Sequence, residues 1–260
     1  MSQDIIQDFV DDLTLKLAPK TVRSVFSVLR LGLESAYEKR LVNDVYSRVK
    51  LPKVKKKEVK VFTHKEQEKI EQFIEHSDNP NDIGILVSLY TGLRIGELCA
   101  LDKKYIDLNR EMLSVRHTLY RVKNKEKGSN KTVLVITTPK SESSVRDIPL
   151  PQFLIAKLKA YQADGSGFLI NRNGKFIEPN VYSRRYKEIL KILDIPYRKY
   201  HSTRHTFATR ALEIGIDIKT LSELLGHSSP TVTLNLYSHS LPEHKRKEMN
   251  RLGELYKSSK

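Results

Sequence analysis

Apolar residues recur at helical spacing between Pro19 and Glu38. The apolar positions are Val22, Val25, Phe26, Leu29, Leu33 and Ala36, and the polar positions between them include Lys20, Arg23 and Arg30. Spacings of three and four residues place such side chains on one face of a helix, and proline suits a first helical turn. We therefore predict an amphipathic helix over residues 19–38, with Ala18 at its N-cap in place of a capping side chain.

A lysine-rich run without hydrophobic periodicity follows this helix. Residues 48–60 read Arg-Val-Lys-Leu-Pro-Lys-Val-Lys-Lys-Lys-Glu-Val-Lys. Such a run is typical of an exposed linker, and its cations could be merely solvated or could contact phosphates. We predict a partial helical domain over residues 1–52 and a basic linker over residues 53–60.

The second part of the chain begins with a helix-start signal. Thr63-His-Lys-Glu66 has the form of a capping box ahead of Ile70, Phe73 and Ile74. Further helical patterns cover residues 83–90 and 95–101. Strand-like stretches at 112–122 and 132–138 flank a polar turn and predict a long hairpin, to which residues 145–150 would add a third strand. Helical patterns then resume, so we predict a mainly α fold with a small antiparallel β-sheet (α+β), a second domain over 61–241 and a C-terminal tail over 242–260.

The charge balance indicates a polyanionic partner. The chain has 46 Lys and Arg against 31 Asp and Glu, a net charge of +15, and neutralising phosphates releases condensed counterions. A membrane-surface protein would gather its lysines on one helix face, whereas here they are spread along the chain. The N-terminus is acidic and unlike a signal peptide, and Cys99 alone cannot form a disulfide framework. We expect an intracellular nucleic-acid-binding protein without a membrane partner.

Several kinds of nucleic-acid enzyme are disfavoured by missing motifs. The chain contains no G-x-x-x-x-G-K-[ST] stretch, which argues against an ATP-driven motor. Its acids are scattered, and Asp102 with Asp107 is more typical of turn caps than of a metal pair. His201 and His205 have the i, i+4 spacing of a zinc helix, but Ser202 stands where a zinc protease has glutamate. We therefore predict no metal and no cofactor.

Four short segments concentrate functional side chains. They are Thr91-Gly-Leu-Arg94-Ile-Gly-Glu97-Leu, Thr138-Pro-Lys140-Ser, His201-Ser-Thr-Arg204, and Leu225-Gly-His227 followed by Tyr237. Each has an ordinary structural explanation when it is taken alone. Arg94 and Glu97 could be an ion pair, Lys140 a solvated loop lysine, and Tyr237 a core or interface tyrosine.

Taken together and in this order, the segments resemble the tyrosine recombinase (phage integrase) family. The family pattern is T-G-L-R-x-x-E-L, a hairpin lysine, H-x-x-R, L-G-H and a tyrosine a short distance later, and Thr203 replaces its more usual leucine. The resemblance covers about residues 61–241, and the preceding helix and linker look like part of the family's core-binding domain. The surroundings of Lys140 are most similar to integrases of temperate phages and conjugative transposons.

The resemblance implies a role for each residue. Arg94 and Arg204 would clamp the five-coordinate phosphate, whose extra negative charge suits planar guanidinium groups. Tyr237 would be the nucleophile and His201 its general base, with His227 a further donor to the phosphate. Lys140 would protonate the departing 5′ oxygen, and Glu97 would orient the site.

The resemblance also implies a function and partners. The protein would be a site-specific DNA recombinase that integrates or excises a mobile element through a covalent 3′-phosphotyrosine. It would bind double-stranded DNA core sites as a tetramer in the bacterial cytoplasm, at the nucleoid, with an accessory DNA-bending or directionality factor. Candidate phosphate contacts outside the active site are Lys20, Arg23, Lys53, Lys55, Lys56 and Lys57.

The two ends of the chain carry further expectations. Only about fifty residues precede the linker, so we expect at least one early helix of the core-binding domain, and an arm-binding domain, to be lacking. In the tail, Met249, Leu252 and Tyr256 form a narrow apolar stripe at helical spacing. The resemblance favours docking of this stripe on a neighbouring subunit.

Two other functions remain open from the sequence. A helix-turn-helix regulator could use residues 206–214 and 218–225 around Gly215, but Arg94, Lys140 and Tyr237 would then have no task. A type IB topoisomerase uses similar chemistry as a monomer. Strand exchange between two sites separates a recombinase from a topoisomerase.

Overall fold

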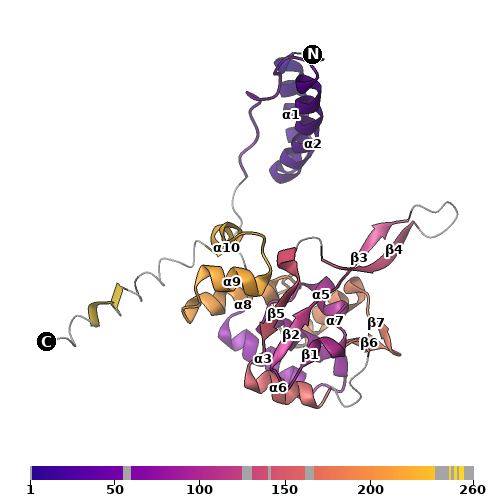
Figure 1. Cartoon of the computed structure of the whole chain (residues 1–260), viewed down its shortest axis with the longest axis vertical. Coiled ribbons are helices and arrows are strands. Elements are labelled where there is room, and N and C mark those ends of the chain that lie inside the picture. Colours follow the sequence, from indigo (N-terminus) through magenta and orange to yellow (C-terminus); the bar gives the residue numbers. More distant parts are fainter. Residues whose placement is uncertain are drawn as a thin grey trace. The chain divides into compact units, whose positions relative to one another are not determined.

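The protein divides into two compact units, Met1–Glu58 and Val59–Lys260. The structure, a computed structural model, describes residues 2–54, 60–124, 131–139, 142–161, 167–237, 246, 249–250 and 252–254 (Figure 1). Among these residues, no helix is long and apolar enough to cross a membrane.

The first unit is built on two helices, α1 (Gln3–Lys16) and α2 (Pro19–Glu38). The α2 helix confirms the predicted helix, and Ala18 at its N-cap makes no side-chain cap. The α1 helix was not predicted. It buries Ile6 and Val10, one turn apart, against a small core shared with α2 and completed by Val22, Phe26, Leu33 and Val45.

Polar contacts hold the chain that follows α2 onto this helix pair. Gln7 accepts from the backbone N–H of Lys50 at 2.8 Å and donates to its carbonyl at 3.2 Å. Arg23 donates to the carbonyl of Pro52 at 3.4 Å. Of the predicted phosphate contacts, Lys20, Arg23 and Lys53 are exposed, and Lys55, Lys56 and Lys57 lie outside the described residues.

The second unit is mainly helical (Figure 1). Thr63 and Glu66 form the predicted capping box at the start of its first helix. The α-helices are α3 (His64–Glu75), α4 (Ile83–Thr91), α5 (Ile95–Cys99), α6 (Gln152–Lys159), α7 (Pro179–Ile192), α8 (Ser202–Glu213), α9 (Ile218–Leu225) and α10 (Pro230–Tyr237). Short 3₁₀ turns lie at η1 (Pro80–Asp82), η2 (Lys103–Tyr105) and η3 (Glu142–Ser144).

Small antiparallel sheets complete this unit. The strands are β1 (Ile106–Asp107), β2 (Met112–Val115), β3 (Thr118–Lys123), β4 (Thr132–Thr137), β5 (Arg146–Pro149), β6 (Asn171–Arg172) and β7 (Lys175–Phe176). They pair as β1-β2-β5, β3-β4 and β6-β7. In the register, Leu113 lies opposite both Ile106 and Ile148, and Leu119 lies opposite Ile136. The mainly α fold with small antiparallel sheets is confirmed.

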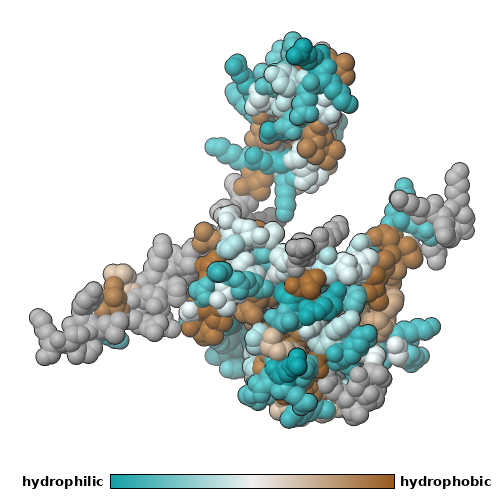
Figure 2. Space-filling view, viewed as in Figure 1, coloured by the Kyte–Doolittle hydropathy of each residue, from teal (hydrophilic) through white to brown (hydrophobic). Residues whose placement is uncertain are grey.

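The predicted strand over 112–122 is wrong in one respect. It divides at Arg116 and His117 into β2 and β3, which belong to different sheets, so the third strand β5 pairs with β2 and not with the hairpin. Arg116 donates to the carbonyl of Arg146 at 3.2 Å and to Asp147 at 2.6 Å, which fastens the end of β2 to β5. The hairpin β3-β4 then extends from the body (Figure 1) and carries the exposed residues Val133 and Ile136. Figure 2 shows apolar surface along this hairpin.

The core of the second unit supports the start of α8. Every residue of α4 except Tyr90 is buried, and α4 packs against α8. Tyr200, two residues before the first residue of α8, shares a hydrogen bond of 2.8 Å with Ser88 of α4. Its ring packs edge-on against Tyr186 and Tyr182, with centroids at 5.0 and 5.7 Å. The backbone from which His201 and Arg204 project is therefore anchored in the core.

A buried ion pair joins β5 to α5. Arg146 donates to both carboxylate oxygens of Glu97, at 3.2 and 2.9 Å, and the two side chains are only 5% and 3% exposed. Burial alone would raise the pKa of Glu97, but the hydrogen bonds and charge of Arg146, aided by Arg94, outweigh it and lower that pKa. Glu97 is therefore held as a carboxylate.

Removing Arg146 should destabilise the protein strongly. Arg146→Met leaves the buried Glu97 charge without its main partner, a loss of about 3–5 kcal/mol in the free energy of unfolding. Arg121→Met is the matched control, because Arg121 pairs with Glu178 at 2.8 Å but is 40% exposed, and should cost at most about 1 kcal/mol. Urea denaturation measures both. Equal losses in the two variants would contradict a special role of burial.

Candidate active site

Guanidinium groups converge on the carboxyl end of α9. Arg146 Nε donates to the carbonyl of Leu224 at 2.7 Å, Arg204 Nη2 to that of Leu225 at 2.6 Å, and Arg94 Nη2 to that of Gly226 at 3.3 Å. The last carbonyls of a helix lack partners inside it and carry partial negative charge. Three successive carbonyls thus accept from arginines of β5, α8 and the start of α5.

Gly226 makes this convergence sterically feasible. It ends α9 in the left-handed conformation, with φ of 62°. A Cβ on it would lie 2.9 Å from the carbonyl oxygen of Ser143 and 3.0 Å from two atoms of Arg146. Only glycine combines this backbone conformation with so close an approach.

Arg204 is fixed on both sides. It lies in the first turn of α8 and is 2% exposed. Besides its bond to Leu225, its Nη1 donates to the carbonyl of Gly92 at 2.8 Å. Gly92 ends α4 in the left-handed conformation, with φ of 65°. The Gly-containing turns after α4 and after α9 therefore set the position of this guanidinium.

Arg94 is the more accessible of the two predicted clamp residues. Its side chain is 37% exposed and donates to Glu97 at 2.7 Å. The other oxygen of Glu97 accepts from the backbone N–H of Arg94 at 2.9 Å. The ion-pair explanation of Arg94 and Glu97 is therefore correct as geometry, and the pair also ties Arg94 to the buried Arg146.

Two predicted histidines adjoin the arginines. His201 is the N-cap of α8. Partial burial of its ring and the charges of Arg204 and Arg94 lower its pKa. Burial and the charges of Arg204, Arg94 and Arg146 lower the pKa of His227 to about 4. Both imidazoles are therefore neutral at pH 7 in the free protein, so His201 is able to accept a proton.

The i, i+4 spacing of two histidines at the start of α8 brings their rings into contact. The rings of His201 and His205 meet edge to face, with centroids 4.5 Å apart. Burial and the neighbouring His201 lower the pKa of His205 to about 4. In the part of the chain that the structure describes, no group of three or more His, Cys, Asp or Glu could hold a metal ion.

The remaining predicted residues are described only in part. Tyr237 is the last residue of α10, ten residues after His227, and its side chain lies outside the described structure. Lys140 also lies outside the described residues. The structure thus brings together five of the predicted residues, Arg94, Glu97, His201, Arg204 and His227. The helix α10, which ends at Tyr237, follows His227 in the sequence.

Sequence reasoning missed Arg146 and Thr233. Alternation along β5 buries Arg146 and Ile148 on the same face, so a strand pattern with arginine at an inward position was an available signal. Thr233 is fully buried and lies 2.8 Å from Nδ1 of His227. The six-residue spacing between His227 and Thr233 in the sequence gave no comparable indication of this contact.

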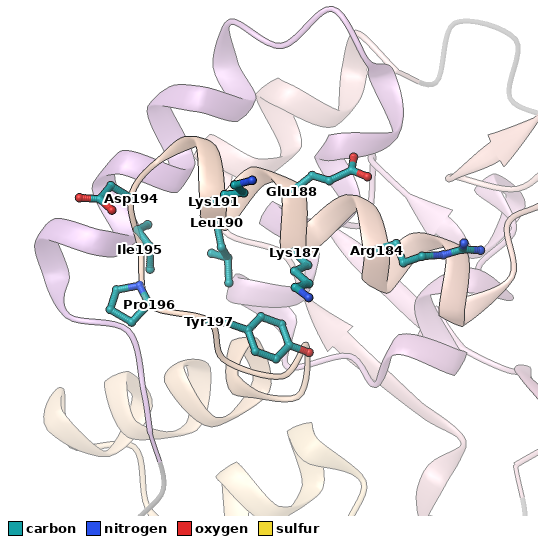
Figure 3. A pocket seen from close by; sticks show the side chains of 9 residues that line it. All are labelled: Arg184, Lys187, Glu188, Leu190, Lys191, Asp194, Ile195, Pro196 and Tyr197. Atoms are coloured by element: carbon teal, nitrogen blue, oxygen red, sulfur yellow. The ribbon is translucent and has the colours of Figure 1, made fainter.

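A separate groove lies along the second half of α7. Its volume is about 710 Å³, and Figure 3 shows its lining side chains, which include Leu190, Ile195 and Tyr197. The Lys187 ammonium lies over the Tyr197 ring, 5.5 Å from its centroid. None of the predicted catalytic residues lines this groove.

Acid should destabilise the folded protein in the absence of DNA, because protonation of His205 and His227 favours the unfolded chain. His205 and His227 have folded-state pKa values of about 4, whereas an unfolded histidine titrates near 6.5. Between these values the unfolded chain binds more protons, so the free energy of unfolding falls as the pH drops from about 7 to about 4. Urea midpoints across this range measure the slope. It should become shallower in His227→Gln, and an unchanged slope would contradict the assignment.

The sequence matches the phage integrase family over residues 60–244. A tyrosine recombinase XerC-like protein of Caldanaerobacter subterraneus subsp. tengcongensis is 33% identical over 217 residues, which cover 76% of this chain. This chain spans 55% of that relative's length.

Solved structures agree in fold. The Tn1549 transposon integrase, in complex with transposon right end DNA, superposes with a TM-score of 0.80 at 24% identity, over 97% of this chain and 86% of that one. A lambda integrase tetramer bound to a Holliday junction superposes with a TM-score of 0.59 at 18% identity, over 89% of this chain and 65% of that one. The chain belongs to the phage integrase family of tyrosine recombinases.

Proposed function

We propose that this protein is a site-specific DNA recombinase that cleaves and rejoins strands through a 3′-phosphotyrosine at Tyr237. The observation that carries the proposal is the fixed placement of Arg94 and Arg204 on the carboxyl turn of α9, beside two neutral histidines. The helix that follows ends at Tyr237. The recombinase relatives and the transposon integrase neighbour favour integration or excision of a mobile element.

The chemistry assigns each group a task. Attack by the Tyr237 oxygen on the scissile phosphorus creates a five-coordinate species with added negative charge, which Arg94 and Arg204 offset. A phenol, with a pKa of about 10, must lose its proton, and neutral His201 accepts it. His227 donates to a phosphate oxygen. Lys140 protonates the departing 5′ oxygen, and Glu97 orients Arg94.

The proposed reaction needs no external energy source, because one phosphodiester replaces another. The bond between Tyr237 and the 3′ phosphate keeps the energy of the broken phosphodiester. A 5′-hydroxyl from a partner strand then attacks the phosphorus and gives its proton to Lys140, while Tyr237 leaves and regains its proton from His201, which restores a DNA strand. The proposed reaction therefore needs neither a metal nor a nucleotide cofactor.

The proposed partners are double-stranded DNA core sites and further copies of this chain. The net charge of +15 favours binding to a polyanion. Residues 1–52 would belong to a core-binding domain, 53–60 would be a linker, 61–241 the catalytic domain and 242–260 a docking tail. Met249 and Leu252 of the tail are 65% and 44% exposed, which leaves them available to a neighbour in a tetramer such as that of lambda integrase. An accessory bending or directionality factor and a bacterial cytoplasmic location complete the proposal.

The helix-turn-helix alternative fits the site less well. The helices α8 and α9 exist, with Gly215 in the turn between them. However, the first turn of α8 holds Arg204, which is 2% exposed and bound to two backbone carbonyls. If the protein were a helix-turn-helix regulator, the buried arginine cluster would have no assigned function. A topoisomerase would relax DNA but would not exchange strands between two sites.

Tyr237→Phe should keep DNA binding and abolish covalent adduct formation, because only the phenolic oxygen is lost. The substrate is a nicked duplex that carries the core site, and denaturing electrophoresis detects the adduct. Tyr197→Phe is a matched control, since Tyr197 is 54% exposed and lines the groove along α7, which none of the predicted catalytic residues lines. Continued cleavage by Tyr237→Phe would reject the proposed nucleophile.

Lys140→Ala should fail chiefly at the departure of the 5′ oxygen. A substrate with sulfur in place of that bridging oxygen has a leaving group that departs without a proton. It should largely restore cleavage by Lys140→Ala but not by Arg204→Ala, which lacks phosphate stabilisation. Cleavage rates on both substrates give the comparison. Equal rescue of both variants, or of neither, would exclude Lys140 as the general acid.

A further inference from the structure

Thr233 makes a contact that packing does not require. It is 0% exposed, while its neighbours Val232 and Leu234 on α10 are 40% and 42% exposed. The buried face of this helix, which packs against α9, therefore carries a hydroxyl where an apolar side chain would fill the same space. Burying a hydroxyl is unfavourable unless it is hydrogen-bonded. Here Oγ1 lies 2.8 Å from Nδ1 of His227.

A neutral histidine has one ring N–H, so its partner determines which nitrogen can donate. Burial and the charges of Arg204, Arg94, Arg146 and His201 lower the pKa of His227 to about 4, so the ring is neutral at pH 7. Among the described residues, the structure gives the Thr233 hydroxyl no other acceptor, so donation to Nδ1 is the arrangement that uses its hydrogen. The ring proton must then reside on Nε2. The imidazole then has a donor at Nε2 for a phosphate oxygen.

We propose that Thr233 is a positioning residue that holds His227 as the Nε2–H tautomer and ties it to the helix that ends at Tyr237. The inference rests on the proposed function for its catalytic meaning. Thr233 precedes Tyr237 by four residues, one helical turn. The same side chain thus sets the donor nitrogen of His227 and links His227 to the backbone that carries the nucleophile.

The direct test is the protonation pattern of the His227 ring in the full chain without DNA. Nitrogen-15 NMR at pH 7 distinguishes the two tautomers, and loss of signals in His227→Gln identifies the ring. Wild type and Thr233→Ser, which keeps the hydroxyl, should show the proton on Nε2. Thr233→Val, which keeps the shape, should shift population toward Nδ1–H. Thr231→Val, at an exposed position of the same helix, should change nothing.

Cleavage of the nicked duplex gives the functional test. Thr233→Val should cleave about tenfold more slowly with unchanged DNA binding, the scale of one lost hydrogen bond. Thr233→Ser should restore most of the rate. Slow cleavage by Thr233→Val with an unaltered His227 tautomer would overturn the proposal, because the effect would then be structural.

The outcomes separate this inference from the proposed function. A wild-type ring protonated on Nδ1 would overturn the role of Thr233 whatever Tyr237 does, and it would do so even if Thr233→Val failed to fold. Continued cleavage by Tyr237→Phe would remove the proposed function but leave the tautomer result intact.

Discussion

The carboxyl turn of α9 is the constraint on which the site depends. Arg94, Arg146 and Arg204 come from different parts of the chain, and their like charges would repel one another if they met in a nonpolar site. The carbonyls of Leu224, Leu225 and Gly226 and the carboxylate of Glu97 offset that repulsion. One carboxylate against three guanidinium groups leaves a positive surplus, which a DNA phosphate would complete.

Burial and this surplus together set the state of the histidines. Partial burial, followed by the charges that would attract the phosphate, lowers the pKa of His201 and of His227, so both rings are neutral before DNA binds. The neutral ring of His201 can accept a proton, and the donor nitrogen of His227 is set by its neighbour Thr233. The positive charge of the site, the neutral ring of His201 and the donor nitrogen of His227 thus all belong to the arrangement around the carboxyl turn of α9.

Sequence reasoning found the residues with motif spacing and missed those defined by distant contacts. Arg94, Glu97, His201, Arg204 and His227 lie in short segments, and the structure brings them together. Arg146 lies 49 residues from Glu97, so no local pattern names that partner.

Two features of the fold were not predicted from the sequence pattern either. The helix α1 was missed because Ile5 and Phe9, which are exposed, blur the period of buried Ile6 and Val10. The break between β2 and β3 depends on the contacts of Arg116 with β5, which the pattern of residues 112–122 does not show.

The most direct test of the central claim is an experimental structure of the chain bound to a nicked core-site duplex. The account predicts that Arg94 and Arg204 contact the non-bridging oxygens of the scissile phosphate while they keep their bonds to the carbonyls of Gly226 and Leu225. A scissile phosphate bound elsewhere, or arginines that leave the end of α9 to reach it, would contradict the claim that this turn builds the site in advance.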